Sequence, residues 1–371
     1  MIDNNRLKQT FLDMVKIASP TREERGVADY VSQVLIALGA TVQEDNLAEI
    51  IGGNSGNIIA HIKGTRPYAP RILLSAHMDT VTPCEGICPI EENGVIRTDG
   101  TTILGGDDKA GVAAILEALR TVREQKLPCG DIEVIFTVAE EGGLLGSKHL
   151  DPAEITADMG FVFDSSGEPG IVIVQAPAEN SITIAIHGKK SHAGLAPELG
   201  INAITLASQA IVAAKQGRID EETTANIGTI AGGVATNIVP DLVTLRAEVR
   251  SLDEQKLSHA TDELLAPFIK LGDKADITVT RGYDAYCLAE SCAVVDTVKR
   301  ACGRIGLTAT LKATGGGSDG NNFNRHGLDT VVLGIGMTNV HTTAETLRIA
   351  DLENSARLAL AIIEEAAQIS K

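Results

Sequence analysis

The sequence predicts an α/β protein of two domains, in which a mixed sheet flanked by helices is interrupted by a smaller ferredoxin-like α+β domain. Three observations predict this fold. Strand-like apolar runs alternate with helical patterns in the first half of the chain, this pattern changes near Ala178, and it returns after about Ser291. A length of 371 residues is also more consistent with two domains than with one.

The chain begins with two predicted helices. Apolar residues recur at helical spacing over residues 5–17 and 23–38, with Pro20 between the segments and Gly39 after the second. Apolar strand-like runs then follow, with a helix between the second and the third of them. The runs are 57–62, 71–75, 132–138, 160–163 and 171–174, and the helix is 110–125.

The middle of the chain has the order βαββαβ, which is typical of a compact ferredoxin-like module. The alternating segments are 181–187, 225–230, 242–249 and 276–280, and the helical segments are 202–216 and 254–271. Helices at 293–305 and 352–369 and a strand at 330–333 follow it. We therefore expect residues 179–287 to be an inserted domain within a discontinuous domain formed by residues 1–178 and 288–371.

The composition disfavours several classes of partner. Asp and Glu number 49 against 32 for Lys and Arg, and the resulting formal charge of −17 repels nucleic-acid phosphates and anionic membranes. No run approaches the roughly 18 apolar residues of a membrane span, and the first residues do not resemble a secretory signal. We expect a cytoplasmic protein with reduced cysteines and with neither nucleic acid nor membrane as a partner.

Acidic and imidazole side chains follow three of the predicted strands. His77 and Asp79 come after one strand, Glu140 and Glu141 after another, and Asp164 after a third. Open α/β sheets bind ligands at such strand ends. His77 could bind a metal while Asp79, two residues later, accepts its other ring N–H. Of two adjacent glutamates, one can bind metal while the other takes a proton from water.

Two loops could complete a metal site. Asp107 lies in the glycine-bounded segment 105–111 ahead of a helix, where its carboxylate could bridge two cations, and His341 lies in a late loop. Lys109 is either a surface residue at the helix start or an anchor for the Asp107 loop. Taken singly, each acid or histidine has an ordinary structural explanation. A metal site explains all of them together, whereas independent surface placement does not.

These motifs resemble those of the M20 metallopeptidases, and the segments Gly-Gly-Asp-Asp-Lys-Ala-Gly and Gly-Gly-Gly-Ser-Asp-Gly are most similar to the tripeptidase T branch. The resemblance covers nearly the whole chain and implies a zinc-peptidase catalytic domain with an inserted lid. It implies two zinc ions bridged by Asp107 and a water, and a cis peptide after Asp107. Cobalt or manganese would fit nitrogen and oxygen ligands nearly as well. The implied ligands are His77 and Asp164 for one ion and Glu141 and His341 for the other, with Glu140 as general base and Asp79 as the partner of His77.

The resemblance extends to the inserted domain. Segment 188–194 is similar to a family loop whose histidine supports the oxyanion, which implies this role for His192. Asn237 and Arg250 match positions that hold the substrate carboxylate, a group that a guanidinium can bind with two N–H donors. The alternation with Val249 equally permits a solvent-facing Arg250. Substrate contacts are also implied for Gly317 and Ser318, and a homodimer could form through the inserted domain.

The function expected from these motifs is a dizinc aminopeptidase that releases the N-terminal residue of short peptides, in particular tripeptides. An M20-type hydrolase of N-acyl amino acids or other small amides is the alternative within the same chemistry. A nucleotide-binding module is disfavoured, because the turn at 315–320 lacks the Gly-Lys-Ser/Thr ending of a P-loop and Asp107 and Asp108 would repel phosphate. A metal-binding scaffold without activity would not need Glu140.

Overall fold

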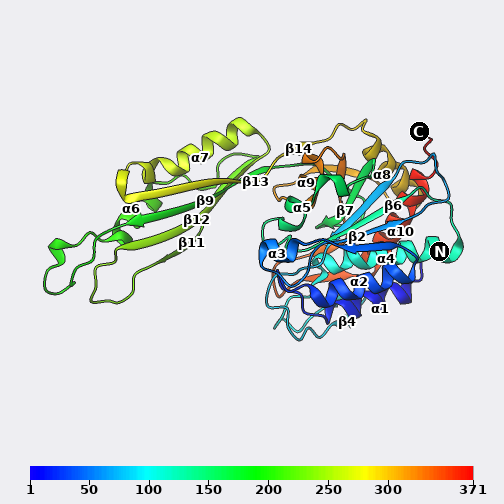
Figure 1. The fold of residues 1–371 in the computed structure, drawn as a ribbon, viewed down its shortest axis with the longest axis horizontal. Helices are drawn as coiled ribbons and strands as arrows, with labels where there is room; N and C mark the ends of the chain where they lie inside the picture. The colour runs from blue at the N-terminus through cyan, green and yellow to red at the C-terminus, as the bar shows by residue number, and fades with distance from the viewer. Residues whose placement is uncertain (371) are drawn as a thin grey trace. The chain divides into compact units, whose positions relative to one another are not determined.

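The computed structural model describes residues 1–370 and divides the chain into two compact units (Figure 1). Unit 1 comprises Met1–Val174, Cys287–Ala313 and the chain from Ser318 onward, and unit 2 comprises Gln175–Tyr286 and Thr314–Gly317. The predicted fold class is confirmed, because unit 1 is built on a mixed sheet with helices packed against it.

The described part of unit 1 has a nine-stranded sheet in the order β1-β2-β6-β3-β7-β16-β8-β14, with β15 paired to β8. Strands β6, β3, β7 and β16 are parallel to their neighbours in this series, whereas β1, β2 and β8 pair in the antiparallel sense. The strands are β1 Thr41–Glu44, β2 Ile58–Ile62, β3 Ile72–His77, β6 Ile132–Thr137, β7 Met159–Ser165, β8 Ile171–Ala176, β14 Tyr286–Cys287, β15 Thr310–Ala313 and β16 Thr330–Gly334.

The central strands are buried on both faces because helices cover both sides of the sheet. All residues of β3 and β6 are buried, as expected for parallel strands between two helical layers. Alternate residues of β3 enter different apolar clusters, with Leu74 in one and Leu73 in the other. The long helices are α1 Asn4–Val15, α2 Arg25–Ala37, α4 Gly106–Gln125, α8 Ala293–Arg304 and α10 Ile349–Ala366, and the short ones are α3 Leu47–Ile51, α5 Leu145–His149, α9 Asp319–Arg325 and a 3-10 turn at Pro152–Glu154.

Helix α4 is the central helix of unit 1 and carries Asp107 in its first turn. It packs on β3, with α1 and α10 on its other sides, which explains why every residue from Ala110 to Leu119 is buried. A second, four-stranded sheet in unit 1 has the order β17-β18-β5-β4. Its strands are β4 Ile90–Glu92, β5 Val95–Arg97, β17 Met337–Thr338 and β18 Thr346–Arg348.

Unit 2 has an antiparallel sheet in the order β10-β11-β12-β9-β13, and two helices contribute to its core. The inward residues of β12 alternate with exposed or half-buried ones, as expected for a sheet with one face on the core. The elements are β9 Ala178–His187, α6 Ala203–Ala213, β10 Gly217–Arg218, β11 Thr223–Gly232, β12 Leu242–Ser251, α7 Glu254–Ile269 and β13 Ala275–Tyr283, with 3-10 turns at Pro197–Leu199 and Gly272–Lys274.

Candidate metal centre

The carboxyl ends of three neighbouring strands position most of the predicted ligands. Strand β3 lies between β6 and β7 and is parallel to both, so the three strands end at the same edge of the sheet. His77 is the last residue of β3, and Asp164 is near the end of β7. Glu140 and Glu141 follow the end of β6 by three and four residues. The predicted gathering of these groups at one edge therefore occurs in the structure.

Asp107 lies between two histidines that come from opposite ends of the sequence. Its Oδ1 is 3.1 Å from His77 Nε2, and its Oδ2 is 3.3 Å from His341 Nε2. His77 Nε2 is also 3.6 Å from Asp164 Oδ1, and His341 Nε2 is 2.8 Å from Glu141 Oε1. The structure thus brings all five predicted ligands together. The peptide between Asp107 and Asp108 is cis, as the resemblance implies.

Three groups of these side chains could each hold a metal ion, since their potential ligand atoms lie within 4.8 Å of one another. The groups are His77, Asp107 and Asp164; Asp107, Glu141 and His341; and His77, Glu140 and Glu141. Imidazole nitrogens and carboxylate oxygens are suitable donors for zinc and for several other divalent metals. Asp107 belongs to two groups, and different oxygens of its carboxylate contact the histidines of those groups, which is the arrangement a bridging ligand requires.

The electrostatics of the cluster also suit a cation. Burial raises the pKa of Asp164 to about 7, and burial together with Asp164 raises the pKa of Glu140 well above its ordinary value. Contacts with Asp107 and Glu141 raise the pKa of His341 to about 10. Buried carboxylates at such separations cannot all be ionised unless positive charge neutralises them. Bound divalent cations would supply this charge.

Asp79 contacts both glutamates as well as His77. Its carboxylate accepts the backbone N–H groups of Glu140 at 2.9 Å and Glu141 at 3.2 Å, and the Thr21 hydroxyl at 2.8 Å. His77 Nδ1 lies 2.9 Å from the Asp79 carbonyl oxygen and 3.4 Å from the carboxylate. The closest acceptor for the ring N–H is therefore the backbone of Asp79 rather than its side chain. The carboxylate mainly orients the start of the Glu140 segment.

Several buried groups around the cluster have no counterpart among the predicted site residues. Asp108 accepts the His77 backbone N–H at 3.1 Å, and Asp319 accepts the Thr137 hydroxyl at 2.5 Å and also the Ser147 hydroxyl. Lys109 is fully buried and donates to the Ile17 carbonyl at 2.7 Å. This contact excludes the surface interpretation of Lys109 and supports the anchor. The Gly-Gly-Gly-Ser-Asp-Gly motif was the available signal for Asp319.

In unit 2, His192 and Asn237 lie on two loops that pair with each other. The His192 segment forms a bridge with Ile238, and the Ala193 N–H donates to the Asn237 carbonyl at 2.9 Å. His192 is exposed, and its Nδ1 accepts the Gly194 and Leu195 N–H groups at 3.2 Å. The ring proton is therefore on Nε2, which leaves Nε2 as a hydrogen-bond donor.

Arg250 lies elsewhere in unit 2, on β12 opposite Glu179 of β9. Its Nη2 donates to Glu248 at 2.9 Å, whereas its Nε is buried and has no hydrogen-bond partner among residues 1–370. Gly317 packs so closely on the Tyr283 ring that a Cβ would come within 2.3 Å of it. Ser318 caps α9 in a capping box with Asn321. Both of these residues thus have structural roles, and their substrate contacts stay predictions.

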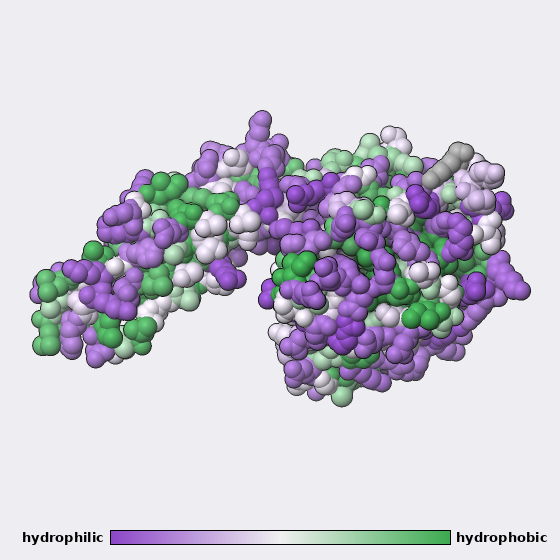
Figure 2. Space-filling model, viewed as in Figure 1, coloured by the Kyte–Doolittle hydropathy of each residue, from purple (hydrophilic) through white to green (hydrophobic). Residues whose placement is uncertain are grey.

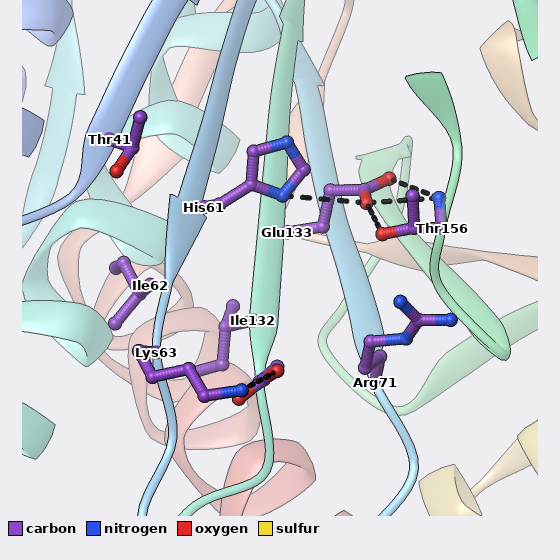
Figure 3. Close-up of a pocket in the computed structure, with 9 residues that line it drawn as sticks. Thr41, His61, Ile62, Lys63, Arg71, Ile132, Glu133 and Thr156 are labelled. Atoms are coloured by element: carbon purple, nitrogen blue, oxygen red, sulfur yellow. Dashed lines mark hydrogen bonds and ion pairs between the residues drawn. The ribbon is translucent and has the colours of Figure 1, made fainter. Parts of the chain in front are cut away.

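A separate polar pocket of about 270 Å³ lies at the opposite ends of the same strands (Figure 3). Lys63 Nζ and Asp131 are 2.7 Å apart, and the Glu133 carboxylate accepts the Thr156 hydroxyl at 2.7 Å. His61 Nδ1 lies 3.7 Å from Glu133. None of the predicted site residues lines this pocket, and most of its charged groups interact with one another. We therefore do not assign the predicted chemistry to it.

Comparison with known proteins shows relatives along the whole chain. The model of peptidase family M20/M25/M40 matches residues 73–365. The crystal structure of aminopeptidase PepT from Bacillus cereus ATCC 10987 superposes with a TM-score of 0.85 at 42% identity, covering 99% of this chain and 100% of that one. A tripeptidase structure from Staphylococcus aureus subsp. aureus Mu50 gives a TM-score of 0.90 at 40% identity, with complete coverage of both chains.

A protein of Bacillus subtilis (strain 168), described as uncharacterized protein YqjE, is 43% identical over 99% of this chain and 100% of its own length. The resemblance that the sequence motifs predict is therefore confirmed. Among residues 1–370, no helix combines the length and the apolar character that crossing a membrane requires.

Proposed function

Because this chain belongs to peptidase family M20/M25/M40, we propose that it is a metal-dependent aminopeptidase that releases the N-terminal residue of short peptides, in particular tripeptides. The observation that carries this proposal is the position of Asp107, whose two oxygens face the histidines of two separate ligand groups. The full-length similarity to an aminopeptidase and a tripeptidase supports the choice of substrate.

Two divalent cations, most simply zinc, would be held by the groups that share Asp107. His77 and Asp164 would complete one group, and Glu141 and His341 the other. When bound, the ions would polarise the peptide carbonyl and lower the pKa of a water molecule. The nitrogen and oxygen donors also permit cobalt or manganese.

Glu140 would act as general base. Glu140 is 8% exposed and lies in a ligand group with His77 and Glu141, and the Asp79 carboxylate accepts its backbone N–H. Glu140 would remove a proton from the attacking water and return it to the amine of the departing fragment. Since Glu141 is a ligand of the proposed centre, the two adjacent glutamates have different tasks.

Residues of unit 2 would bind the substrate. The unpartnered Nε of Arg250 suits a substrate carboxylate, because a buried N–H without an acceptor is costly and a carboxylate would satisfy it. The Nε2–H of His192 would support the oxyanion, and Asn237 lies on the loop paired with that of His192.

The spacing of these residues favours a dimer in which His192 serves the partner's site. The His192 loop follows His187 at the end of β9, and the Asn237 loop precedes Leu242 at the start of β12. His187 and Leu242 pair with each other, so both loops are at this end of the sheet. Arg250 lies eight residues after Leu242 along β12, where it pairs with Glu179 of β9. Eight strand residues span about 26 Å, while an extended tripeptide spans about 10 Å. One tripeptide therefore does not reach both ends of the sheet of one chain.

Unit 2 also offers a surface for such pairing. Strand β10 pairs with β11 only at Thr224 and Ala225, so the rest of the outer edge of β11 has no strand beside it among residues 1–370. Hydrophobic side chains are visible on the surface of this unit (Figure 2). The exposed ones include Val212, which is 87% exposed, and Ile230, which is 56% exposed. An unpaired edge and exposed apolar residues favour association with a second copy.

A cytoplasmic location would suit this enzyme. All six cysteines are free thiols, as is usual for proteins of reducing compartments.

A substrate panel tests the function. Purified protein loaded with zinc is assayed on tripeptides, dipeptides, tripeptides with an acetylated N-terminus and N-acyl amino acids. We expect the highest kcat/KM for free tripeptides, and no turnover by Glu140→Gln, which should retain its metal. Activity confined to acylated substrates would replace the aminopeptidase with the amidohydrolase alternative.

A further inference from the structure

Glu345 connects the two loops that carry Asp107 and His341. It follows His341 by four residues and is 1% exposed. Its Oε2 accepts the backbone N–H groups of Leu104 at 2.9 Å and Gly105 at 2.8 Å, and its Oε1 accepts the Asp107 N–H at 3.0 Å. One buried side chain thus satisfies three donors on the segment that leads to Asp107.

We propose that Glu345 is a positioning residue that fixes Asp107 and His341 relative to each other and so sets the metal affinity of the Asp107, Glu141 and His341 group. This inference rests on the metal centre of the proposed function. The inference goes beyond the proposed function, because it assigns a role to a side chain that is not itself one of the proposed ligands.

The burial pattern of segment 341–345 indicates that Glu345 anchors the loop that carries His341. Residues 341–344 are exposed, and Glu345 is the buried residue of the segment 341–345. The His341 ring is about half exposed and contacts Asp107 and Glu141, two groups of the proposed centre itself. The position of His341 therefore depends on how firmly Glu345 holds the end of its loop. A buried carboxylate that accepts several N–H groups is a firm attachment, since each unsatisfied partner would cost free energy.

The glycines of the Asp107 loop provide independent support. A Cβ at Gly106 would lie 2.9 Å from Glu345 Oε1, and Gly105, which is itself a donor to Glu345, has a φ of +72°. A side chain at position 106 would therefore push the carboxylate away. The close approach of Glu345 explains why this segment contains adjacent glycines, because the backbone must present its N–H groups directly to the carboxylate.

Zinc affinity measured without catalysis tests the proposal. The metal-free protein is titrated with zinc against a chromophoric chelator to obtain the two dissociation constants. The variants His77→Ala and His341→Ala identify which constant belongs to which group. In Glu345→Gln, the amide oxygen can still accept hydrogen bonds in place of one carboxylate oxygen. The amide NH₂ takes the place of the other oxygen and cannot accept, so it faces a backbone N–H donor and that hydrogen bond is lost. We expect the constant that His341→Ala weakens to rise about 10- to 100-fold, with less than about a threefold change in the other.

Two further variants separate positioning from a merely structural role. Glu133→Gln is the matched control, because Glu133 is also a buried carboxylate, bound to Thr156 at the other end of the strands. It should leave both constants unchanged. Gly106→Ala tests the same contact from the opposite side and should weaken the same constant as Glu345→Gln, which keeps the test decisive if that variant does not fold.

Equal zinc constants in Glu345→Gln and the parent would overturn the positioning role, even if the variant melts at a lower temperature. A parent protein that binds no zinc would instead overturn the metal centre, and the proposed function with it.

Discussion

Asp79 shows how one buried carboxylate can organise two functional groups. It accepts the N–H groups of both Glu140 and Glu141, and its own carbonyl is the closest acceptor for His77 Nδ1. The proposed general base, Glu140, and the proposed ligand Glu141 are therefore aligned by the same residue that fixes the tautomer of another proposed ligand, His77. This arrangement leaves little freedom for the Glu140 backbone, which suits a group that must meet a water molecule at one position.

Glu24 is a second buried carboxylate behind the same segment. Its Oε1 accepts the N–H groups of Arg22 at 2.7 Å and Ala139 at 3.0 Å, while its Oε2 is buried without a hydrogen-bond partner among residues 1–370. Burial raises the pKa of Glu24 to about 7. At a pH between the unfolded pKa, near 4.5, and this folded pKa, Glu24 is protonated in the folded protein but ionised in the unfolded chain. The free energy of unfolding that Glu24 contributes therefore falls as the pH rises through this range.

We therefore predict that Glu24→Gln stabilises the protein at pH 8 relative to the parent, by at most about 3 kcal/mol, and has a much smaller effect at pH 5. Gln keeps the acceptor for Arg22 and Ala139 and removes the buried charge. Urea unfolding of both proteins at the two pH values measures the difference. A Gln variant that is equally destabilised at pH 5 and pH 8 would contradict the raised pKa.

The residues of the site differ in how readily the sequence reveals them. His77, Asp107, Glu140, Glu141 and Asp164 follow apolar runs or lie beside glycines, so the local pattern marked them as candidates and the resemblance to the M20 motifs implied their roles. Glu345 and Glu24 act by accepting backbone N–H groups from segments about 240 and 115 residues away. Such contacts leave no local sequence pattern, because the carboxylate of any buried acid can accept from the N–H group of any backbone segment that packs against it. They become visible only when the fold is known.

At the level of elements, the N-terminal part of α4 must lie close to the end of β7. A Cβ at Gly111 would lie 2.2 Å from the Phe163 carbonyl oxygen and 2.4 Å from Asp108 Oδ1. Phe163 precedes Asp164, and Asp108 follows Asp107. The last glycine of the Gly-Gly-Asp-Asp-Lys-Ala-Gly motif therefore allows the helix and the strand to bring two proposed ligands together.

We predict that Gly111→Ala destabilises the protein by about 1–3 kcal/mol, because backbone atoms must shift to admit the methyl group, and that it weakens zinc binding by the His77, Asp107 and Asp164 group. Gly303→Ala is a matched control, since Gly303 lies in α8 and, apart from its chain neighbours and the nearby backbone of its own helix, no atom lies within 4 Å of the place its methyl group would take. It should be neutral or stabilising by up to about 1 kcal/mol. Thermal unfolding and zinc titration check both variants, and equal behaviour of the two would refute the close-packing argument.

The elements that the sequence predicted are those with enough residues to show a period. Helix α4 and strands β3, β6 and β16 were predicted because long apolar runs or helical spacing persist over many residues. Strands β4, β5, β17 and β18 have two or three residues each and partly exposed side chains. No periodicity can be read from such short segments, and their pairing depends on residues far apart in the chain, as in the contact of β5 with β18.

At the level of the whole molecule, the two units carry different parts of the proposed chemistry. Unit 1 contains all five proposed metal ligands and Glu140, whereas unit 2 contains His192, Asn237 and Arg250. Within unit 2, the loops of His192 and Asn237 and the position of Arg250 are at opposite ends of the sheet. In a dimer, His192 of one protomer would then serve the site of its partner.

This arrangement predicts that two inactive variants restore activity when mixed. Glu140→Gln removes the base and His192→Ala removes the oxyanion donor, so each homodimer should be inactive. In a heterodimer, the protomer that carries His192→Ala keeps its own Glu140 and receives His192 from the Glu140→Gln partner. One of its two sites is then intact. After random exchange half of the dimers are heterodimers, so activity should recover to about a quarter of the parental value.

The exchange needs a control for subunit contact, and the free edge of β11 provides one. Ile230→Asp in both variants places a charge on this exposed strand and should reduce dimer formation in light scattering, because a charge on an edge strand opposes edge-to-edge pairing. The mixture should then recover no activity, while zinc affinity stays at the parental value since the metal ligands all belong to unit 1. If heterodimers form but the mixture stays inactive, His192 acts within its own chain or does not act in the reaction. The distance along β12 between the His192 loop and Arg250 would then not require a second protomer.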